Sequence, residues 1–255
     1  MPLEHKPLAG KTAIVTGAGQ GVGRGVALAL ASAGASVMVM GRTESKLVSV
    51  RDEITNRGER AILFAGDVKQ LADIERCVAM TVTEFGTVDI LVNNAQEVAL
   101  GSLLEVADAD VTAGWESGPM ATLRFMRACH PHLVGGGAIV NMGSRAGVRP
   151  DPIRRGAYAA VKEAIRALTR AAAMEWASEG IRVNAVLPYA MSPAIEQLAI
   201  DRPEEYEKTR RAVPLGRIGD AEHDIGRAVV FLVGPDAGYI TGATIPVDGG
   251  NAFLG

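Results

Sequence analysis

Tyr158 and Lys162 form a pair whose spacing suits proton transfer. They are four residues apart and share a face if both lie on the helix that we expect to begin near Gly156. A tyrosine has an ordinary pKa of about 10, and a neighbouring ammonium favours its anion, so we expect Lys162 to lower the pKa of Tyr158. Alone, either residue would be an ordinary helix or surface residue. Ser144 upstream and a glycine-rich turn favour a catalytic role for the pair.

A glycine-rich turn follows the first stretch that we expect to be a strand. Its glycines alternate with other residues, in the order Gly17, Gly19, Gly21 and Gly23. Glycine lets a backbone turn tightly and approach a pyrophosphate, and the N-terminus of the next helix offers free N–H groups to the phosphates. The spacing differs from the commoner Gly-x-Gly-x-x-Gly pattern. Its position in a strand–helix–strand unit nevertheless predicts dinucleotide binding.

The end of the second expected strand indicates which dinucleotide binds. In dinucleotide-binding folds an acidic residue here binds the ribose 2′-hydroxyl, whereas a nearby arginine accommodates a 2′-phosphate. This strand ends in Gly41, Arg42 and Thr43, with no carboxylate. Because a guanidinium makes forked, charge-assisted contacts with phosphate, Arg42 predicts that NADP(H) is favoured over NAD(H). The alternative is that Arg42 only stacks over the adenine of either cofactor.

An alternation of strands and helices must position these residues. Short apolar runs alternate with stretches of helical spacing, which is typical of a parallel sheet covered on both faces. We predict strands at 12–16, 36–40, 61–65, 89–92, 138–142, 182–186 and 244–247. Helices are predicted at 22–33, 43–57 and 71–85, followed by Gly34, Gly58 and Gly86 as terminators. The expected fold class is α/β, a Rossmann fold with a doubly wound parallel sheet of about seven strands and helices on both faces.

Composition excludes several classes of protein. The 255 residues carry no repeat or linker, so we predict a single NAD(P)-binding domain over 1–255. The balance of 26 basic and 29 acidic residues argues against nucleic acid and membrane as partners. Two distant cysteines, Cys77 and Cys129, and the lack of a signal peptide or long apolar run indicate a cytoplasmic protein. The histidines lack metal-ligand spacing, so no metal site is expected.

Each of two segments near the expected site allows a functional and a purely structural interpretation. The segment 190–214 is rich in charge and proline and follows a strand, as substrate lids often do, although a solvated helical excursion fits equally well. Arg149, Arg154 and Arg155 lie between Ser144 and Tyr158. They could attract an anionic substrate, but a solvated loop is the simpler interpretation.

Almost the whole chain resembles the single-domain short-chain dehydrogenases/reductases. The matching motifs are TGxxxGxG at 16–23, the adenine-contacting pair Asp67-Val68, the first three residues of NNAG at 93–95, the serine at Ser144, YxxxK at 158–162, and a closing pattern from Phe231 to Gly250. Each motif could occur by chance. Their order and spacing together identify the chain as a member of this family.

The resemblance implies an NADP(H)-dependent oxidoreductase that interconverts a ketone and a secondary alcohol, both small molecules. Ser144 would donate a hydrogen bond to the substrate oxygen, Tyr158 would exchange the proton, and Lys162 would also hold the nicotinamide ribose. Relatives of this kind are commonly homotetramers, with a homodimer as the alternative. The cofactor would contact Gly17, Gly19, Gln20, Gly21, Val22, Gly23, Arg42, Thr43, Asp67, Val68, Asn93, Ala95, Tyr158, Lys162, Pro188 and Met191.

The chain departs from the family pattern at several positions. The family's active-site asparagine is replaced by Gly118 in one alignment and by Thr122 in another, and Pro119 could still break the helix there and expose a carbonyl. Gln96 stands where NNAG has glycine, so it must point away or fill part of the pocket. Tyr189 replaces the usual glycine after a proline. Many NADP-preferring relatives also carry a basic residue where this chain has Gln20.

Two other functions remain open. The missing asparagine and Gln96 are compatible with a nucleotide-binding protein of little turnover, a sensor or an assembly subunit. A second alternative is another reaction on the same fold, such as enoyl reduction. The YxxxK spacing argues against it, because typical enoyl reductases of this superfamily space the tyrosine and lysine further apart.

Overall fold

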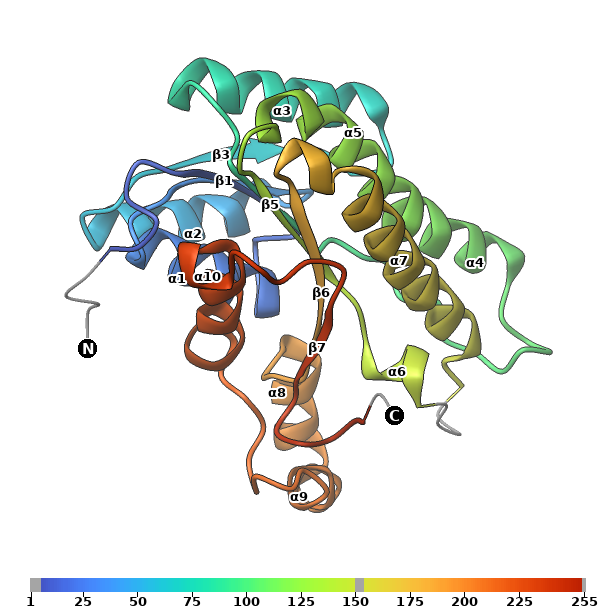
Figure 1. Cartoon of the computed structure of the whole chain (residues 1–255). Coiled ribbons are helices and arrows are strands. Elements are labelled where there is room, and N and C mark those ends of the chain that lie inside the picture. Colours follow the sequence, from blue (N-terminus) through green and yellow to red (C-terminus); the bar gives the residue numbers. More distant parts are fainter. Residues whose placement is uncertain (1–5, 150–153, 254–255) are drawn as a thin grey trace.

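The chain, described by a computed structural model over residues 6–149 and 154–253, is built around one parallel sheet (Figure 1). Seven strands pair in the order β3-β2-β1-β4-β5-β6-β7 within the described residues. They are β1 (Thr12–Thr16), β2 (Ser36–Gly41), β3 (Ala61–Ala65), β4 (Ile90–Asn93), β5 (Ala138–Met142), β6 (Arg182–Pro188) and β7 (Thr244–Val247). The predicted doubly wound α/β Rossmann fold is confirmed.

Helices connect the strands and cover the sheet. In chain order they are α1 (Gly21–Ser32), α2 (Glu44–Asn56), α3 (Leu71–Phe85), α4 (Asp108–Trp115), α5 (Ala121–Leu133), α6 (Arg145–Val148), α7 (Gly156–Glu175), α8 (Pro193–Asp201), α9 (Pro203–Arg211) and α10 (Arg227–Val233). Two π-helical turns, η1 (Glu116–Met120) and η3 (Ala221–Gly226), precede α5 and α10. Two short 3₁₀ turns are η2 (Ala177–Glu179) and η4 (Pro235–Ala237).

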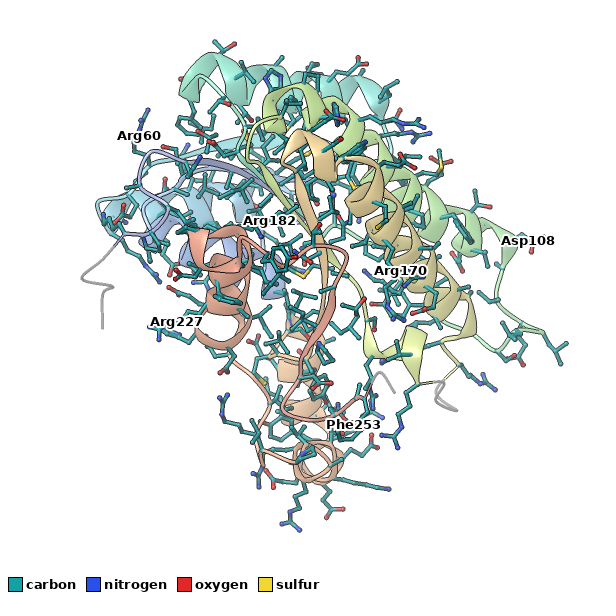
Figure 2. The ribbon with its side chains drawn as sticks, viewed as in Figure 1. Arg60, Asp108, Arg170, Arg182, Arg227 and Phe253 are labelled. Carbon is teal, nitrogen blue, oxygen red and sulfur yellow. The ribbon has the colours of Figure 1, made fainter. Side chains whose placement is uncertain are left out.

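The apolar core lies in two layers, one on each face of the sheet. Val15 of β1 packs in the layer formed with α1, α2 and α10, and its neighbour Ile14 packs in the layer formed with α3, α5 and α7. This alternation explains why the strands are apolar on both faces. Burying a side chain of this size stabilises the fold by roughly 1.5–3 kcal/mol. Arg182 at the start of β6 adds hydrogen bonds to the end of α10, at 2.6 Å from the Leu232 oxygen and 3.2 Å from the Gly234 oxygen (Figure 2).

The sheet order reverses at β1, and this positions the site. The strands that follow β1 in sequence, β2 and β3, lie on one side of it, whereas β4 pairs on its other side. The connections after β1 and β4 therefore leave the sheet in opposite directions and open a crevice at the carboxyl ends of the strands. The glycine turn follows β1, and residues 94–97 follow β4, so both segments border this crevice.

The strand predictions are correct to within two residues. Strand β2 extends to Gly41, β4 is displaced by one residue, and β6 extends to Pro188. Segment 190–214 forms α8 and α9 at the bottom of Figure 1, where the Ser192 hydroxyl caps α8 by accepting the Ile195 N–H at 3.4 Å. Within the described residues, no helix has the length and apolar character needed to cross a membrane.

Candidate active site

The glycine turn is held against the end of β4 by two polar side chains. Thr16 Oγ1 accepts hydrogen bonds from the backbone N–H groups of Asn94, at 3.0 Å, and Ala95, at 3.1 Å. The Asn94 amide donates in return to the carbonyl oxygens of Thr16, at 3.0 Å, and Gly17, at 3.1 Å. Thr16 is buried, so protein partners replace water at its hydroxyl. These bonds fix the turn at the reversal point of the sheet.

Two glycines of the turn leave no space for a side chain. A Cβ atom on Gly23 would lie 2.2 Å from the Gly17 oxygen and 2.4 Å from Asn94 Nδ2. Gly17 itself has a φ of +64°, a conformation that favours glycine. Helix α1 therefore rests directly on the turn, and its N-cap residue Gln20 makes no side-chain bond to the first N–H groups. Free N–H groups at a helix N-terminus favour a bound phosphate.

A pocket of about 420 Å³ opens over this turn. Among the predicted cofactor ligands, it is lined by Gly17, Gly19, Gln20, Gly21, Val22, Gly23, Arg42, Thr43, Asp67, Val68 and Ala95. Further lining residues were not predicted as cofactor ligands: Gly41, Lys46, Leu47, Gly66, Asn94, Gln96, Glu97, Ser117, Ser192 and Pro193. Asn94 carried a signal in the sequence, because it adjoins Asn93 in the NNA motif.

Other predicted ligands lie outside the lining of this pocket. Asn93 is buried, and its amide donates to Asn141 Oδ1 at 2.9 Å. Pro188 ends β6, and the N–H of Met191 donates to the Gly219 oxygen at 2.8 Å. Tyr158 and Lys162 lie on α7, whose first turn follows the end of β5. Their contact with a cofactor stays a prediction.

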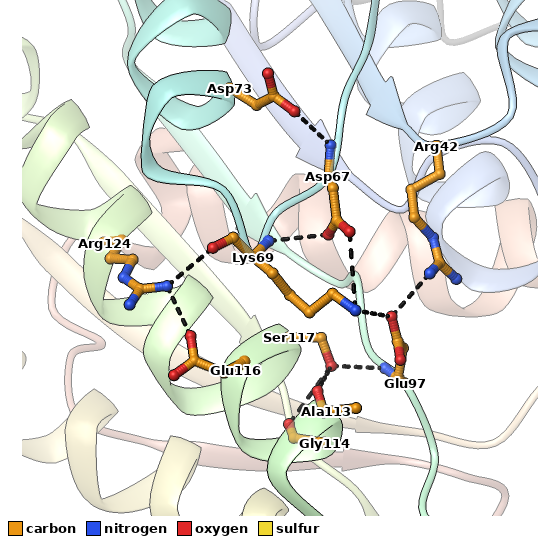
Figure 3. Close-up of polar contacts among 10 residues, drawn as sticks. All are labelled: Arg42, Asp67, Lys69, Asp73, Glu97, Ala113, Gly114, Glu116, Ser117 and Arg124. Atoms are coloured by element: carbon orange, nitrogen blue, oxygen red, sulfur yellow. Dashed lines mark hydrogen bonds and ion pairs between the residues drawn. The ribbon is translucent and has the colours of Figure 1, made fainter. Parts of the chain in front are cut away.

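Charged side chains form ion pairs at the edge of the pocket (Figure 3). Arg42 Nη1 and Lys69 Nζ both donate to Glu97 Oε1, at 2.8 Å and 2.9 Å. Lys46 of α2 donates to Gln20 Oε1 at 2.5 Å. Lys46 therefore brings a basic side chain next to Gln20, although the glycine turn itself contains no basic residue.

The structure brings Ser144 and Tyr158 together. Ser144 is the N-cap residue of α6, and its hydroxyl oxygen accepts the Ala146 N–H at 3.2 Å. Burial raises the pKa of the Tyr158 hydroxyl, and a hydrogen bond from Ser144 and the positive charge of Arg155 partly offset this increase. The neutral, proton-donating form of Tyr158 is therefore favoured.

Lys162 is buried beneath Tyr158. Lys162 is only 4% exposed. Its Nζ donates to the Met142 oxygen at 2.7 Å and lies 5.7 Å from the centroid of the Tyr158 ring. Burial lowers the pKa of Lys162 to about 7. That Lys162 lowers the pKa of Tyr158 stays a prediction. Its ammonium points to a carbonyl, and the groups that lower the pKa of Tyr158 are Ser144 and Arg155.

Comparisons with known proteins agree with this geometry. The family model described as enoyl-(acyl carrier protein) reductase matches residues 17–252. A 12α-hydroxysteroid dehydrogenase from a Clostridium species is 40% identical over 250 residues, which cover 94% of this chain and 96% of that protein. A short-chain dehydrogenase/reductase from Serratia marcescens is 30% identical, covers 97% of this chain and 100% of its own, and superposes with a TM-score of 0.90. The chain belongs to the short-chain dehydrogenase/reductase family.

A third relative bears on the cofactor. A short-chain dehydrogenase from Burkholderia cenocepacia, solved in complex with NADP, is 31% identical with a TM-score of 0.88 and covers 96% of this chain and 99% of its own. The present chain is accordingly an oxidoreductase that acts on CH–OH or C=O groups with a nicotinamide cofactor.

One of the two candidate positions for the family asparagine, Gly118, lies in an irregular helical turn. Residues Glu116–Met120 form the π-helical turn η1, which contains Gly118 and Pro119. Proline lacks the N–H that a regular helix needs, so the wider turn accommodates it. Thr122 lies beyond this turn, buried in α5. The irregularity therefore includes Gly118 and not Thr122.

Gln96 fills the space that Gly118 leaves. Its Nε2 donates to the Glu97 oxygen at 2.8 Å and to the Gly114 oxygen at 2.9 Å. A Cβ atom on Gly118 would lie 2.5 Å from Gln96 Oε1 and 2.8 Å from Val161 Cγ1. The two departures from the family pattern, Gln96 and Gly118, therefore pack against each other. Gln96 lines the pocket, and Gly118 lies against Val161 of α7, which stands between Tyr158 and Lys162 in the sequence.

The third departure, Tyr189, lies near the arginines of the site. Burial raises the pKa of the Tyr189 hydroxyl, and the charges of Arg145 and Arg155 partly offset the increase. Of the other arginines, Arg154 pairs with Glu105 at 3.2 Å, with both side chains exposed. Arg149 is exposed at the end of α6. Residues 150–153, between Arg149 and Arg154, lie outside the described residues.

The contact between Gln96 and Gly118 can be tested by adding one carbon. We expect Gly118→Ala to destabilise the protein by about 1–3 kcal/mol, as overpacking does, and to lower kcat because α7 shifts. Adding Gln96→Ala should restore part of the loss. Urea unfolding and steady-state rates measure both effects.

Gly114→Ala is the matched control, because the nearest atom to its new Cβ would lie at 3.7 Å. It should be tolerated, with alanine favoured over glycine within a helix. Wild-type stability and rate in Gly118→Ala would contradict the proposed packing.

The burial of Lys162 predicts a pH-dependent cost in stability. Its folded-state pKa of about 7 lies below the ordinary lysine value of 10.5, so the cost is complete below pH 7 and falls as the pH rises toward 10.5. Lys162→Met should raise the melting temperature by several degrees, more at about pH 6 than at about pH 9. It should also abolish most activity. The exposed Lys208→Met serves as control, and a pH-independent difference would contradict the expected charge burial.

Proposed function

We propose that this short-chain dehydrogenase/reductase uses NADP(H) to interconvert a ketone and a secondary alcohol. The observation that carries the proposal is the contact of the Ser144 and Tyr158 hydroxyls above the buried Lys162. Ser144 follows β5, and β5 pairs with β4, whose end borders the glycine pocket. Proton-transfer groups and a phosphate-binding turn therefore share one edge of the sheet.

The pocket residues fit a nicotinamide dinucleotide. The turn at Gly17 and Gly23 leaves backbone space that a Cβ would fill, and α1 begins without a side-chain cap. These residues would hold the pyrophosphate, while Arg42 and Lys46 would face the phosphate of the adenosine ribose. When bound, the cofactor supplies or accepts the hydride.

The side chains of this chain account for the proton. In reduction, Tyr158 donates its hydroxyl proton to the substrate oxygen as the carbonyl carbon accepts hydride, and in oxidation it takes that proton back. Ser144 donates a hydrogen bond to the same oxygen. Lys162, with its pKa near 7, holds a charge below Tyr158 that stabilises the phenolate left by proton donation.

Apolar groups around the start of α7 support a bulky, apolar substrate. Leu100, Leu103 and Leu104 are exposed by 61%, 75% and 98%. Leu103 lies against Gly156, two residues before Tyr158, with its Cδ2 at 2.7 Å from the Cβ position of that glycine. The name of the Clostridium relative, a 12α-hydroxysteroid dehydrogenase, supports a secondary alcohol on a ring system. The substrate panel should therefore contain hydroxysteroids and ketosteroids with and without a carboxylate.

The resemblance also supports a cytoplasmic homotetramer or homodimer, which light scattering of the purified chain would test. The segment that forms α8 and α9 suits the role of a substrate lid, because Ser192 and Pro193 at its start line the pocket.

The runner-up function is nucleotide binding without turnover, and the Gln96–Gly118 contact motivates it. Tight NADPH binding by calorimetry, without oxidation by any carbonyl of a broad panel, would favour this alternative. An enoyl substrate belongs in the same panel, because the matching family model carries that description.

Tyr158→Phe tests the proposed role of the tyrosine. Without the hydroxyl proton, kcat should fall about a hundredfold or more, whereas NADPH affinity should stay within a few-fold of wild type. Tyr239→Phe is the control, since Tyr239 is fully exposed. Full activity of Tyr158→Phe in NADPH oxidation assays would refute the assigned role.

A further inference from the structure

Glu97 is a carboxylate inside a pocket that is expected to receive phosphates. Its Oε1 accepts bonds from Arg42 at 2.8 Å and from Lys69 at 2.9 Å (Figure 3). Arg42 follows β2, Lys69 follows β3 and Glu97 follows β4, so one carboxylate bridges three strand ends. Arg42 and Glu97 also line the pocket. The cation predicted to recognise a 2′-phosphate thus already binds an anion of the protein.

The backbone of Glu97 is fixed more firmly than the arginine that it binds. Its N–H donates to Ser117 Oγ at 2.9 Å, and Ser117 donates to the Ala113 oxygen at 2.7 Å (Figure 3). Its carbonyl accepts the Gln96 amide at 2.8 Å. The Glu97 side chain is 30% exposed, compared with 62% for Arg42. These bonds hold the Glu97 backbone in place beside Arg42, whose side chain is the more exposed of the two.

Glu97 favours the charged form of Lys69. The hydrogen bond to Glu97 is the largest cause that raises the pKa of Lys69, and the nearby Asp67 adds to it. Lys69 Nζ lies 3.8 Å from Asp67 Oδ2. Loss of Glu97 would leave Lys69 with one carboxylate partner and Arg42 with none among the ion pairs of the described residues.

We propose that Glu97 is a specificity-determining residue for the cofactor, acting as an internal anion that competes with a 2′-phosphate for Arg42 and Lys69. A phosphate must displace the carboxylate or accept its repulsion, whereas an unphosphorylated ribose can bind with Glu97 in place. Because the Arg42–Glu97 pair is exposed, solvent screens it, and the competition changes cofactor binding by only a few-fold. Glu97 thus reduces the preference for NADP(H) that Arg42 alone would give. This inference rests on the proposed cofactor pocket.

Glu97→Gln tests the competition while it keeps the backbone bonds. The dissociation constants of NADPH and NADH are measured by fluorescence titration of the full chain. We expect the NADPH constant to fall about two- to fivefold and the NADH constant to change less than about twofold. The gain should shrink as salt is raised, because salt screens exposed charges.

Glu116→Gln is the matched control. It breaks an ion pair of the same length, 2.8 Å to Arg124, and changes the net charge equally, but Glu116 is outside the pocket lining. Both dissociation constants should stay unchanged. In an Arg42→Ala background, Glu97→Gln should lose most of its effect on NADPH, because the main contested cation is gone.

Three results would overturn the inference. Weaker NADH binding in Glu97→Gln with unchanged NADPH binding would mean that Glu97 binds the ribose hydroxyl instead. Equal changes for both cofactors, or none, would remove any role in specificity while leaving the proposed function intact. A wild-type chain that binds neither dinucleotide would refute the proposed function as well.

Discussion

The hydrogen bonds between Thr16 and Asn94 are the constraint on which the site depends. They join the ends of β1 and β4, where the sheet reverses, and hold the glycine turn beneath α1. The neighbouring Asn93 points into the protein instead and donates to Asn141 of β5, which donates to Thr169 of α7 at 3.0 Å. Successive residues of one strand end therefore hold the glycine turn and the helix that carries Tyr158 and Lys162.

The buried lysine illustrates how function opposes stability at this site. Few protein groups stabilise a buried ammonium here: Lys162 has the Met142 oxygen as its hydrogen-bond acceptor, and burial lowers its pKa to about 7. A core chosen only for stability would place an apolar residue at this position. A titrating lysine beneath a tyrosine is useful for proton transfer near neutral pH, because its charge can respond to the charge on Tyr158. The apolar layers of the sheet compensate for its cost.

The sequence alone was sufficient for features that are local in the chain. Strand periodicity placed β1, β3, β5 and β7 at their observed bounds, and the glycine turn and Arg42 were found from their neighbours in sequence. Side-chain pairings between strand ends were not predictable in this way. Glu97 is 55 residues from Arg42, and Lys46 is 26 from Gln20. Such contacts depend on strand order, register and side-chain rotamers. The effect of burial, which raises the pKa of Tyr158, also could not be read from local sequence.

The π-helical turn η1 connects the two halves of the site through adjacent residues. Ser117 lines the pocket and accepts the N–H of Glu97, whereas Gly118 faces Gln96 and Val161. After β4, Glu97 therefore lines the pocket, while Gln96 fills the space beside Gly118 of η1, which packs against α7. Because a wider turn at Pro119 replaces regular helix here, its position is set by these side chains as well as by backbone bonds. The turn that holds the Glu97 backbone through Ser117 therefore also packs against α7, next to Val161, through Gly118.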